Sequence, residues 1–236
     1  MAPYALAADE SCRKVKIGSM DITAHESSTW KYILNQLISG QDLGSRHVDW
    51  AMDEIMTGST PEPILASFLT SLHMKGETSE ELGALARGML AKAETIDLDV
   101  HAVDIVGTGG DQQNTVNIST MAALVIAGTG ATVVKHGNRA STSKSGSADV
   151  LEALGIQLDM PIKSVAACAR QVGITFLFAM TFHPSMRFVG PTRKMLGIPT
   201  AFNYLGPMTN PARVSSSAIG VANPQMVEKM AWVFAN

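Results

Sequence analysis

A glycine-rich turn at residues 107–111 has the composition of an anion-binding loop. It reads GTGGD and follows the β-branched run of residues 102–106. Three glycines in four positions let backbone N–H groups approach an anion closely. The turn is not the dinucleotide fingerprint GxGxxG, because position 112 is Gln112, and no P-loop lysine follows. Two interpretations therefore stay open, a phosphate-binding turn or only a tight connection from strand to helix.

A short hydroxyl-containing segment, Asn117-Ile118-Ser119-Thr120, follows that turn. We expect Ser119 or Thr120 to be the N-cap of a helix that begins at Met121. The free N–H groups and the positive end of that helix would then face the glycine turn. A phosphate bound there would gain fixed donors and about 0.3–1 kcal/mol from the helix dipole. Alternatively, the hydroxyls do nothing beyond capping.

A second polar segment, residues 135–147, follows another β-branched run. It begins with the letters KHGNR and continues with ASTSKSGS, so cations are followed by hydroxyls and a glycine. Two such segments at neighbouring strand ends predict a ligand that carries phosphate at both ends, or one long polyphosphate. His136 alone is ambiguous, because a lone histidine is more often a packing or hydrogen-bonding residue.

The elements that must position these segments change in kind along the chain. Apolar spacing with glycine stops predicts helices, with Ser79 as the N-cap of the last, over residues 29–40, 46–56, 61–73 and 80–91. Nothing between residues 23 and 95 has the pattern of a strand. The later part alternates predicted strands at 102–106, 131–135, 174–179 and 216–221 with helices at 120–127, 148–154, 164–172 and 224–234. This alternation indicates an α/β fold with a mostly parallel sheet, whose ligands bind at the carboxyl ends of the strands.

These patterns divide the chain into three parts. We expect a disordered tail at residues 1–22, an all-helical domain at 23–98 and an α/β domain at 99–236. The composition is globular, with 46% apolar and 17% charged residues and a net charge of −3.

Composition also excludes several classes of protein. Lysine and arginine number 18 against 21 acidic residues, which disfavours nucleic acid as a partner. No apolar run reaches the ~18–20 residues of a membrane helix, and Cys12 and Cys168 lie far apart without metal-ligand spacing. We therefore expect a cytoplasmic protein without a membrane partner.

Taken together, the motifs resemble those of the anthranilate phosphoribosyltransferase family. They are GTGGD, NxST, KHGNR with GSADVLEALG, and a block from His183-Pro184 through Arg193 to FNYLGPMTNP, so the resemblance covers about residues 29–236. It implies a small helical domain, joined also by residues near 184–197, that is hinged to the α/β domain and forms a homodimer. The implied activity transfers the phosphoribosyl group of phosphoribosyl pyrophosphate (PRPP) to the amine of anthranilate, in tryptophan biosynthesis, with Mg²⁺.

The resemblance also implies which residues hold the substrates. PRPP would be held by Gly107, Gly110, Asp111, Thr115, Asn117, Ile118, Ser119, Thr120, Lys135, His136, Gly137, Asn138, Arg139, Ala140, Ser141, Thr142, Ser143 and Ser147. Anthranilate would contact Gly107, Asn138 and Arg193, with Arg193 opposite its carboxylate, and Ser119 would also reach Mg²⁺. An aromatic amine is already a nucleophile, so the enzyme mainly binds and neutralises charge, and His136 is not assigned as a base.

The sequence departs from the family pattern in three places, the smallest of which is Thr142, where the family often has serine and the hydroxyl is kept. Members continue beyond Asn236 and carry an adjacent Asp-Glu pair that holds magnesium, whereas Asp9–Glu10 and Asp53–Glu54 here lie outside the predicted sheet. Because Mg²⁺ prefers carboxylate and phosphate oxygens, we expect the 236 residues alone to have little or no transferase activity, with the sheet lacking its last strands. Met180 stands where the family often has proline, which leaves the anthranilate side of the pocket less defined.

Two other functions stay open at this point. A pyrimidine nucleoside phosphorylase shares the fold and the phosphate-binding glycine turn, but the KHGNR and FNYLGPMTNP blocks favour the transferase. A catalytically retired relative that binds nucleic acid would need a basic surface, which the charge balance does not offer.

Overall fold

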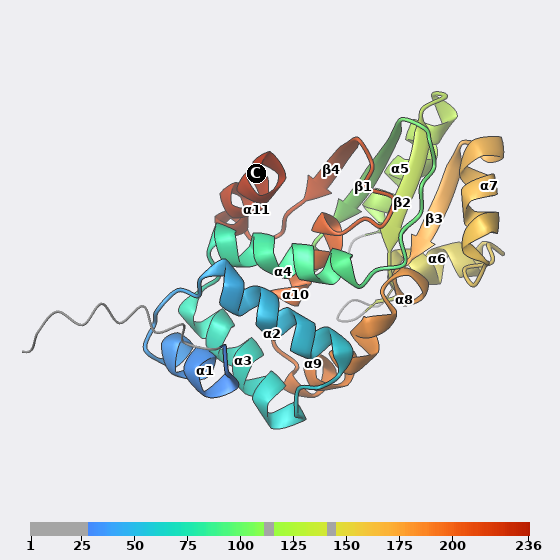
Figure 1. Cartoon of the computed structure of the whole chain (residues 1–236). Coiled ribbons are helices and arrows are strands. Elements are labelled where there is room, and N and C mark those ends of the chain that lie inside the picture. The colour runs from blue at the N-terminus through green and yellow to red at the C-terminus, as the bar shows by residue number, and fades with distance from the viewer. Residues whose placement is uncertain (1–27, 111–115, 141–144) are drawn as a thin grey trace, which may run out of the picture.

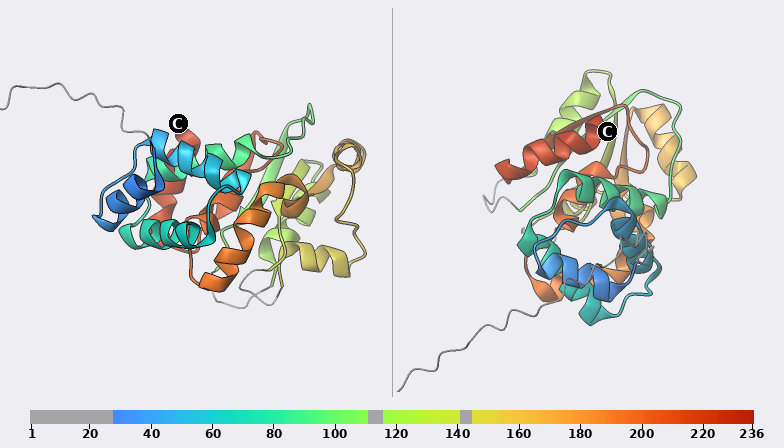
Figure 2. Two further views of the ribbon diagram at one scale, coloured as in Figure 1. Left: turned by 60° about the horizontal axis from the view of Figure 1, so that its bottom comes forward. Right: turned by 60° about the vertical axis from the view of Figure 1, so that its left-hand side comes forward.

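Two adjoining units make up the chain, a bundle of helices and a parallel sheet with its own helices (Figure 1). The structure is a computed structural model that describes residues 28–110, 116–140 and 145–236. Figure 2 shows the two units side by side from two further directions. The predicted tail at residues 1–22 lies outside the described residues.

The helical unit is built from four consecutive helices, α1 (Trp30–Ile38), α2 (Ser45–Thr57), α3 (Glu62–Lys75) and α4 (Ser79–Ala91). Their buried side chains repeat at helical spacing, as the sequence predicts, and no strand lies between residues 28 and 95. The predicted N-cap of α4 is wrong by one residue. Thr78 is the cap, because its hydroxyl accepts from the Glu81 N–H (3.1 Å) while the Glu81 carboxylate accepts from the Thr78 N–H (2.9 Å).

Later segments of the chain complete the core of this unit. The 3₁₀ turn η1 (Pro184–Phe188) packs on α2, and α9 (Gly190–Leu196) packs on α3. Two elements that the sequence assigns to the α/β part, α10 (Phe202–Met208) and α11 (Val227–Ala235), also contribute buried residues. Leu205 of α10 and Met230 of α11 lie in the same apolar cluster as the buried residues of α1 to α4.

The sheet has four parallel strands in the order β3-β2-β1-β4, which confirms the predicted α/β class. The strands are β1 (Ala102–Gly107), β2 (Thr132–Gly137), β3 (Ile174–Phe178) and β4 (Ser216–Gly220). Between them run α5 (Ile118–Gly128), α6 (Ser147–Ala153), α7 (Ile162–Val172) and α8 (Ala179–Phe182), and a 3₁₀ turn η2 (Pro224–Met226) precedes α11. All four carboxyl ends lie at one edge, which faces the helical unit (Figure 1).

Within the described residues, no helix is both long and apolar enough to cross a membrane.

Candidate anion-binding site

The two polar segments predicted from the sequence meet at the carboxyl edge of the sheet. The Lys135 ammonium, at the end of β2, donates to the Ser119 hydroxyl in the first turn of α5 (3.1 Å). The Asn117 amide donates to the Ser145 hydroxyl across the same two segments (3.4 Å). The structure therefore brings the connection after β1 and the connection after β2 together.

The glycine turn after β1 requires its glycines. Gly109 and Gly110 have φ angles of +66° and +75°, a region that favours glycine. Gly107 lies beside β4, where a Cβ would make an ordinary contact of 3.4 Å with the Gly220 carbonyl oxygen, and the Thr108 N–H donates to that same oxygen (2.9 Å). The turn is thus fixed between two strands. Asp111 and Thr115, which the sequence also places in the site, lie outside the described residues.

The predicted cap of α5 is wrong. The N-cap is Asn117, and the helix begins at Ile118 rather than Met121. Ser119 and Thr120 are therefore already inside the first turn, and the Asn117 side chain makes no capping hydrogen bond within the described residues. The Ser119 hydroxyl contacts Lys135 instead, and the Thr120 hydroxyl is buried without a hydrogen-bond partner among the described residues. The N-terminal turn of α5 still faces the site, but its hydroxyls belong to the site and not to a cap.

Lys135 is a buried cation held by oxygen atoms. Its side chain is 3% exposed, and the ammonium also donates to the Ile105 carbonyl of β1. Burial lowers the pKa of Lys135 to about 8, and the nearby Asp104 carboxylate opposes that change. The lysine is therefore still mostly charged at neutral pH.

Asp104 is a residue of the site region that the sequence analysis missed. It is fully buried in β1, and its carboxylate accepts from the His136 backbone N–H (3.1 Å) and from the Asn210 amide (2.9 Å). Asn210 also donates to the Val134 carbonyl (3.0 Å), so the pair joins two strands to the segment before β4. Burial raises the pKa of Asp104, and its hydrogen bonds oppose this. The available signal was an acidic residue inside an otherwise apolar strand.

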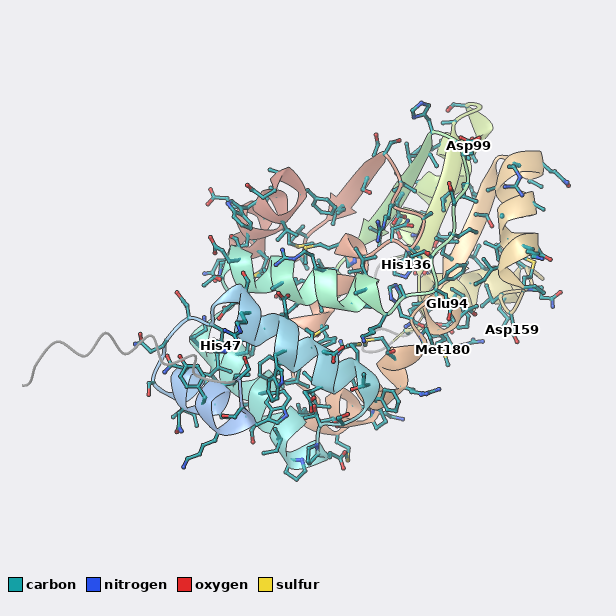
Figure 3. All side chains as sticks on the ribbon, viewed as in Figure 1. His47, Glu94, Asp99, His136, Asp159 and Met180 are labelled. Atoms are coloured by element: carbon teal, nitrogen blue, oxygen red, sulfur yellow. The ribbon has the colours of Figure 1, made fainter. Side chains whose placement is uncertain are left out.

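The imidazole ring of His136 is neutral and is held in place by a hydrogen bond to the backbone of α10. Its Nδ1 lies 3.0 Å from the Gly206 carbonyl oxygen, which can only accept, so Nδ1 carries the proton and Nε2 is bare. The Nε2 atom is buried and has no hydrogen-bond partner among the described residues. The His183 ring lies 5.1 Å away between centroids, and burial lowers the pKa of His136 to about 3. Figure 3 places His136 and Met180 at the seam between the sheet and the helical unit.

The segment after β2 folds back on itself so closely that glycine is required twice. A Cβ on Gly137 would stand 2.4 Å from the Ser147 hydroxyl, and one on Gly146 would stand 2.4 Å from the Ala140 nitrogen. The Asn138 carbonyl accepts from the Ser147 hydroxyl (3.3 Å) and from the Ala148 N–H (3.2 Å). Ser141, Thr142 and Ser143 lie outside the described residues.

Arg139, which the resemblance places among the PRPP-binding residues, is paired with acidic side chains of α6. Its guanidinium pairs with both oxygens of Glu152 (2.7 and 3.0 Å) and with Asp149 (3.3 Å), on the neighbouring α6. The exposed ion pairs raise the pKa of Arg139, so it stays charged. The side chain holds the segment against α6.

Arg193 of α9 offers a cation that the described residues leave without an ion pair. Its guanidinium donates to the Asn203 amide oxygen (3.1 Å) and lies 5.8 Å from the centroid of the Phe202 ring. Burial lowers its pKa, yet a guanidinium remains charged. A half-buried cation with neutral neighbours suits an incoming carboxylate.

The described residues do not form a magnesium site by themselves. No cluster of three or more acidic, histidine or cysteine side chains that could hold a metal occurs in the described parts of the chain. Ser119, the predicted magnesium ligand, already accepts a hydrogen bond from Lys135. The arrangement as described supplies backbone, hydroxyl and ammonium donors for an anion.

Two sequence families match the chain in adjoining stretches. The family described as "Glycosyl transferase family, helical bundle domain" matches residues 31–93, and that described as "Glycosyl transferase family, a/b domain" matches residues 99–236.

Curated relatives carry one common name. The anthranilate phosphoribosyltransferase of Arthrobacter sp. is 58% identical over 208 residues, which cover 88% of this chain and 59% of that protein. That of Rhodococcus jostii is 54% identical over 207 residues, with coverage of 88% and 57%. The chain therefore spans a little under 60% of the length of these relatives.

Solved structures that resemble this chain carry the same name as the curated relatives. The anthranilate phosphoribosyltransferase of Thermus thermophilus superposes with a TM-score of 0.81 at 41% identity, covering 86% of this chain and 62% of that one. The Saccharomyces cerevisiae enzyme in complex with PRPP and Mg gives a TM-score of 0.82 at 32% identity, with coverage of 89% and 62%. The same yeast enzyme in complex with 4-fluoroanthranilate gives 0.74 at 30% identity, with coverage of 88% and 62%.

Proposed function

This chain belongs to the glycosyl transferase family of those helical bundle and a/b domains, and on that premise we propose that it acts as an anthranilate phosphoribosyltransferase. The observation that carries the proposal is the meeting of two strand-end segments through the Lys135–Ser119 and Asn117–Ser145 contacts. We call the two segments, the connection after β1 and the connection after β2, the cradle. Their meeting fits a sugar with phosphate at both ends. Relatives of that name, and a yeast structure with PRPP, support the choice of ligand.

The proposed reaction replaces one bond at the anomeric carbon of ribose. The amine nitrogen of anthranilate bonds to that carbon, the bond to the diphosphate oxygen breaks, and the nitrogen releases a proton to water. Pyrophosphate leaves with the bonding electrons. Positive charge builds on the ribose and negative charge on the leaving group, so fixed donors around the diphosphate lower the barrier.

In this scheme the described residues bind and orient, and none acts as a base. The Lys135 ammonium, the Ser119 hydroxyl and the glycine-turn amides face the phosphates, and Arg193 meets the anthranilate carboxylate. An Arg–carboxylate pair also fixes orientation, because its hydrogen bonds are directional. The yeast complex with 4-fluoroanthranilate supports an aromatic amine as the acceptor.

Magnesium enters the proposal through the relatives, since a yeast structure contains PRPP with Mg. The described residues do not provide a cluster of three or more side chains that could hold it. Because the described residues lack a cluster of metal-binding side chains, we propose that the chain binds PRPP and transfers its phosphoribosyl group only slowly. A turnover assay with Mg²⁺ tests this, and rapid turnover would contradict it.

We also propose that the chain forms a homodimer through its helical unit and is cytoplasmic. Ile38 of α1 and Met195 of α9 are 74% and 68% exposed, which offers apolar surface on that unit. The free Cys168 thiol fits a reducing compartment. Light scattering on the purified chain checks the dimer, and a monomer at all concentrations would contradict it.

Calorimetric titration tests the substrate class directly. We expect PRPP to bind the chain and raise its melting temperature, whereas uridine with inorganic phosphate does neither. The reverse result would favour the pyrimidine nucleoside phosphorylase. Binding of neither ligand would contradict both functions.

A further inference from the structure

We infer that Asp149 is a positioning residue that joins the backbone after β2, at Ala140, to the start of α6, at Gly146, and so fixes the described backbone next to the proposed PRPP site. This role deepens the proposed function and rests on it. Asp149 lies in the first turn of α6 and was not among the residues that the sequence or the resemblance placed in the site.

The Asp149 carboxylate accepts hydrogen bonds from backbone N–H groups on both sides of residues 141–145. Its Oδ2 accepts from the Ala140 N–H (3.0 Å) and from the Gly146 N–H (2.7 Å), while Oδ1 accepts from the Arg139 guanidinium (3.3 Å). The Ala140 and Gly146 amides are six residues apart in the chain, yet they share one oxygen atom. We call this arrangement the Asp149 clamp, with Ala140, Gly146 and Arg139 as its partners.

The clamp exceeds ordinary helix capping. A carboxylate at the third position of a helix accepts from the N-cap N–H, and here that N–H belongs to Gly146. Capping does not require the second bond to Ala140, nine residues before Asp149, or the contact with Arg139. These two interactions attach the residues that follow β2 to α6, so the carboxylate does more than stabilise a helix end.

Close packing supports the same interpretation. A Cβ on Gly146 would stand 2.4 Å from the Ala140 nitrogen and 2.6 Å from the Arg139 carbonyl carbon. The two ends therefore touch through their backbones, and only glycine permits the approach that lets Asp149 reach both amides. The amide hydrogen bonds, followed by the Arg139 contact, hold the pKa of Asp149 below its usual value, so it is ionised at neutral pH.

The sign of the charge makes the inference testable. A carboxylate beside a phosphate-binding segment repels the ligand, so its removal should tighten binding if charge alone matters. If Asp149 acts by holding the Ala140 backbone beside Gly146, its removal weakens PRPP binding instead. The two effects have opposite signs.

The experiment uses the full chain and three variants, Asp149→Ala, Gly146→Ala and the control Glu152→Gln. Glu152 lies on the same helix and pairs with the same Arg139 but contacts no backbone amide in the described hydrogen bonds. We measure hydrogen exchange at the Ala140 and Gly146 amides without ligand, and PRPP and anthranilate affinity by calorimetry. Asp149→Asn, which keeps one acceptor oxygen, serves as the conservative variant.

We expect Asp149→Ala and Gly146→Ala to speed exchange at the clamped amides and to weaken PRPP binding at least tenfold. Anthranilate affinity should change less than twofold, Glu152→Gln should match the wild type, and Asp149→Asn should recover part of the loss. Unchanged or tighter PRPP binding by Asp149→Ala, or an equal loss in Glu152→Gln, would overturn the inference. If Asp149→Ala fails to fold, Asp149→Asn and Gly146→Ala decide by the same criteria.

The same data separate this inference from the proposed function. Failure of the wild-type chain to bind PRPP contradicts the function and with it the role of Asp149 in PRPP binding. Unchanged exchange at Ala140 and Gly146 in Asp149→Ala contradicts the clamp alone, even where the wild type binds PRPP.

Discussion

At the scale of single residues, the protonation of Lys135 sets the charge of the cradle. Its pKa of about 8 predicts that PRPP affinity falls as pH rises above that value, approaching tenfold per pH unit. Folding should respond in the opposite direction. Because the folded pKa lies below the ordinary 10.5, the unfolded chain binds more protons between pH 8 and 10.5, and this group's contribution to stability rises there.

Calorimetry and urea unfolding from pH 7.5 to 9.5 measure both trends, with Lys135→Met as the control that removes them. An affinity that stays constant over this range would contradict the prediction. A parallel loss of stability and affinity would instead indicate alkaline unfolding.

Arg193 provides a second prediction at this scale. Changing Arg193→Gln removes the cation proposed to meet the anthranilate carboxylate, so anthranilate affinity should fall about 10- to 100-fold, the equivalent of a charged hydrogen bond of about 1.5–3 kcal/mol. PRPP affinity should be unchanged. Lys194→Gln, at an exposed neighbour, is the matched control. Equal losses in the two variants would rule out a specific role for Arg193.

At the scale of elements, the capping of α4 can be tested directly. Thr78→Ala removes the hydroxyl that caps α4 by accepting from the Glu81 N–H, and it should lower the free energy of unfolding by about 1 kcal/mol. Ser79→Ala, at the residue first expected to be the cap, should change it by less than about 0.5 kcal/mol. Urea unfolding of both variants provides the measurement, and a larger effect at Ser79 would reverse the assignment.

The N-cap residues of α4 and α5 also show which details the sequence does not predict. Apolar spacing and glycine stops predict α1 to α4 closely, because they reflect local burial that recurs every turn. A cap is decided by one residue, and neighbouring Thr and Ser, or Asn and Ser, are nearly equivalent candidates. For this reason the N-cap of α4 is Thr78 and not the predicted Ser79, and the N-cap of α5 is Asn117 and not the predicted Ser119 or Thr120.

Long-range contacts were less predictable still. The meeting of the two polar segments followed from the rule that parallel strands end at one edge. The pairing of Arg139 with Glu152, and the choice of Asn210 as a partner of the buried Asp104, depend on packing that no local pattern encodes. From the sequence alone, an arginine that follows a strand could bind a phosphate or pair with acidic side chains of a neighbouring helix.

At the scale of the whole molecule, the helical core is not confined to the N-terminal part of the chain. Leu205 of α10 is fully buried in the same cluster as Ile33 and Leu85, although more than 100 residues separate it from either. The two units therefore share elements, and we expect them to unfold together. Helix α10 lies next to α4 (Figure 1).

Leu205→Ala tests this arrangement in the full chain. The cavity should lower the free energy of unfolding by about 2–5 kcal/mol and leave a single transition, because α10 contacts both α4 and β2. Leu124→Ala, at a half-exposed position of α5, should cost less than about 0.5 kcal/mol. Tryptophan fluorescence reports on Trp30 of α1, Trp50 of α2 and Trp232 of α11, all in the helical unit, and hydrogen exchange reports on the sheet. If Leu205→Ala shifts the fluorescence transition alone, the units unfold separately and the shared core does not couple them.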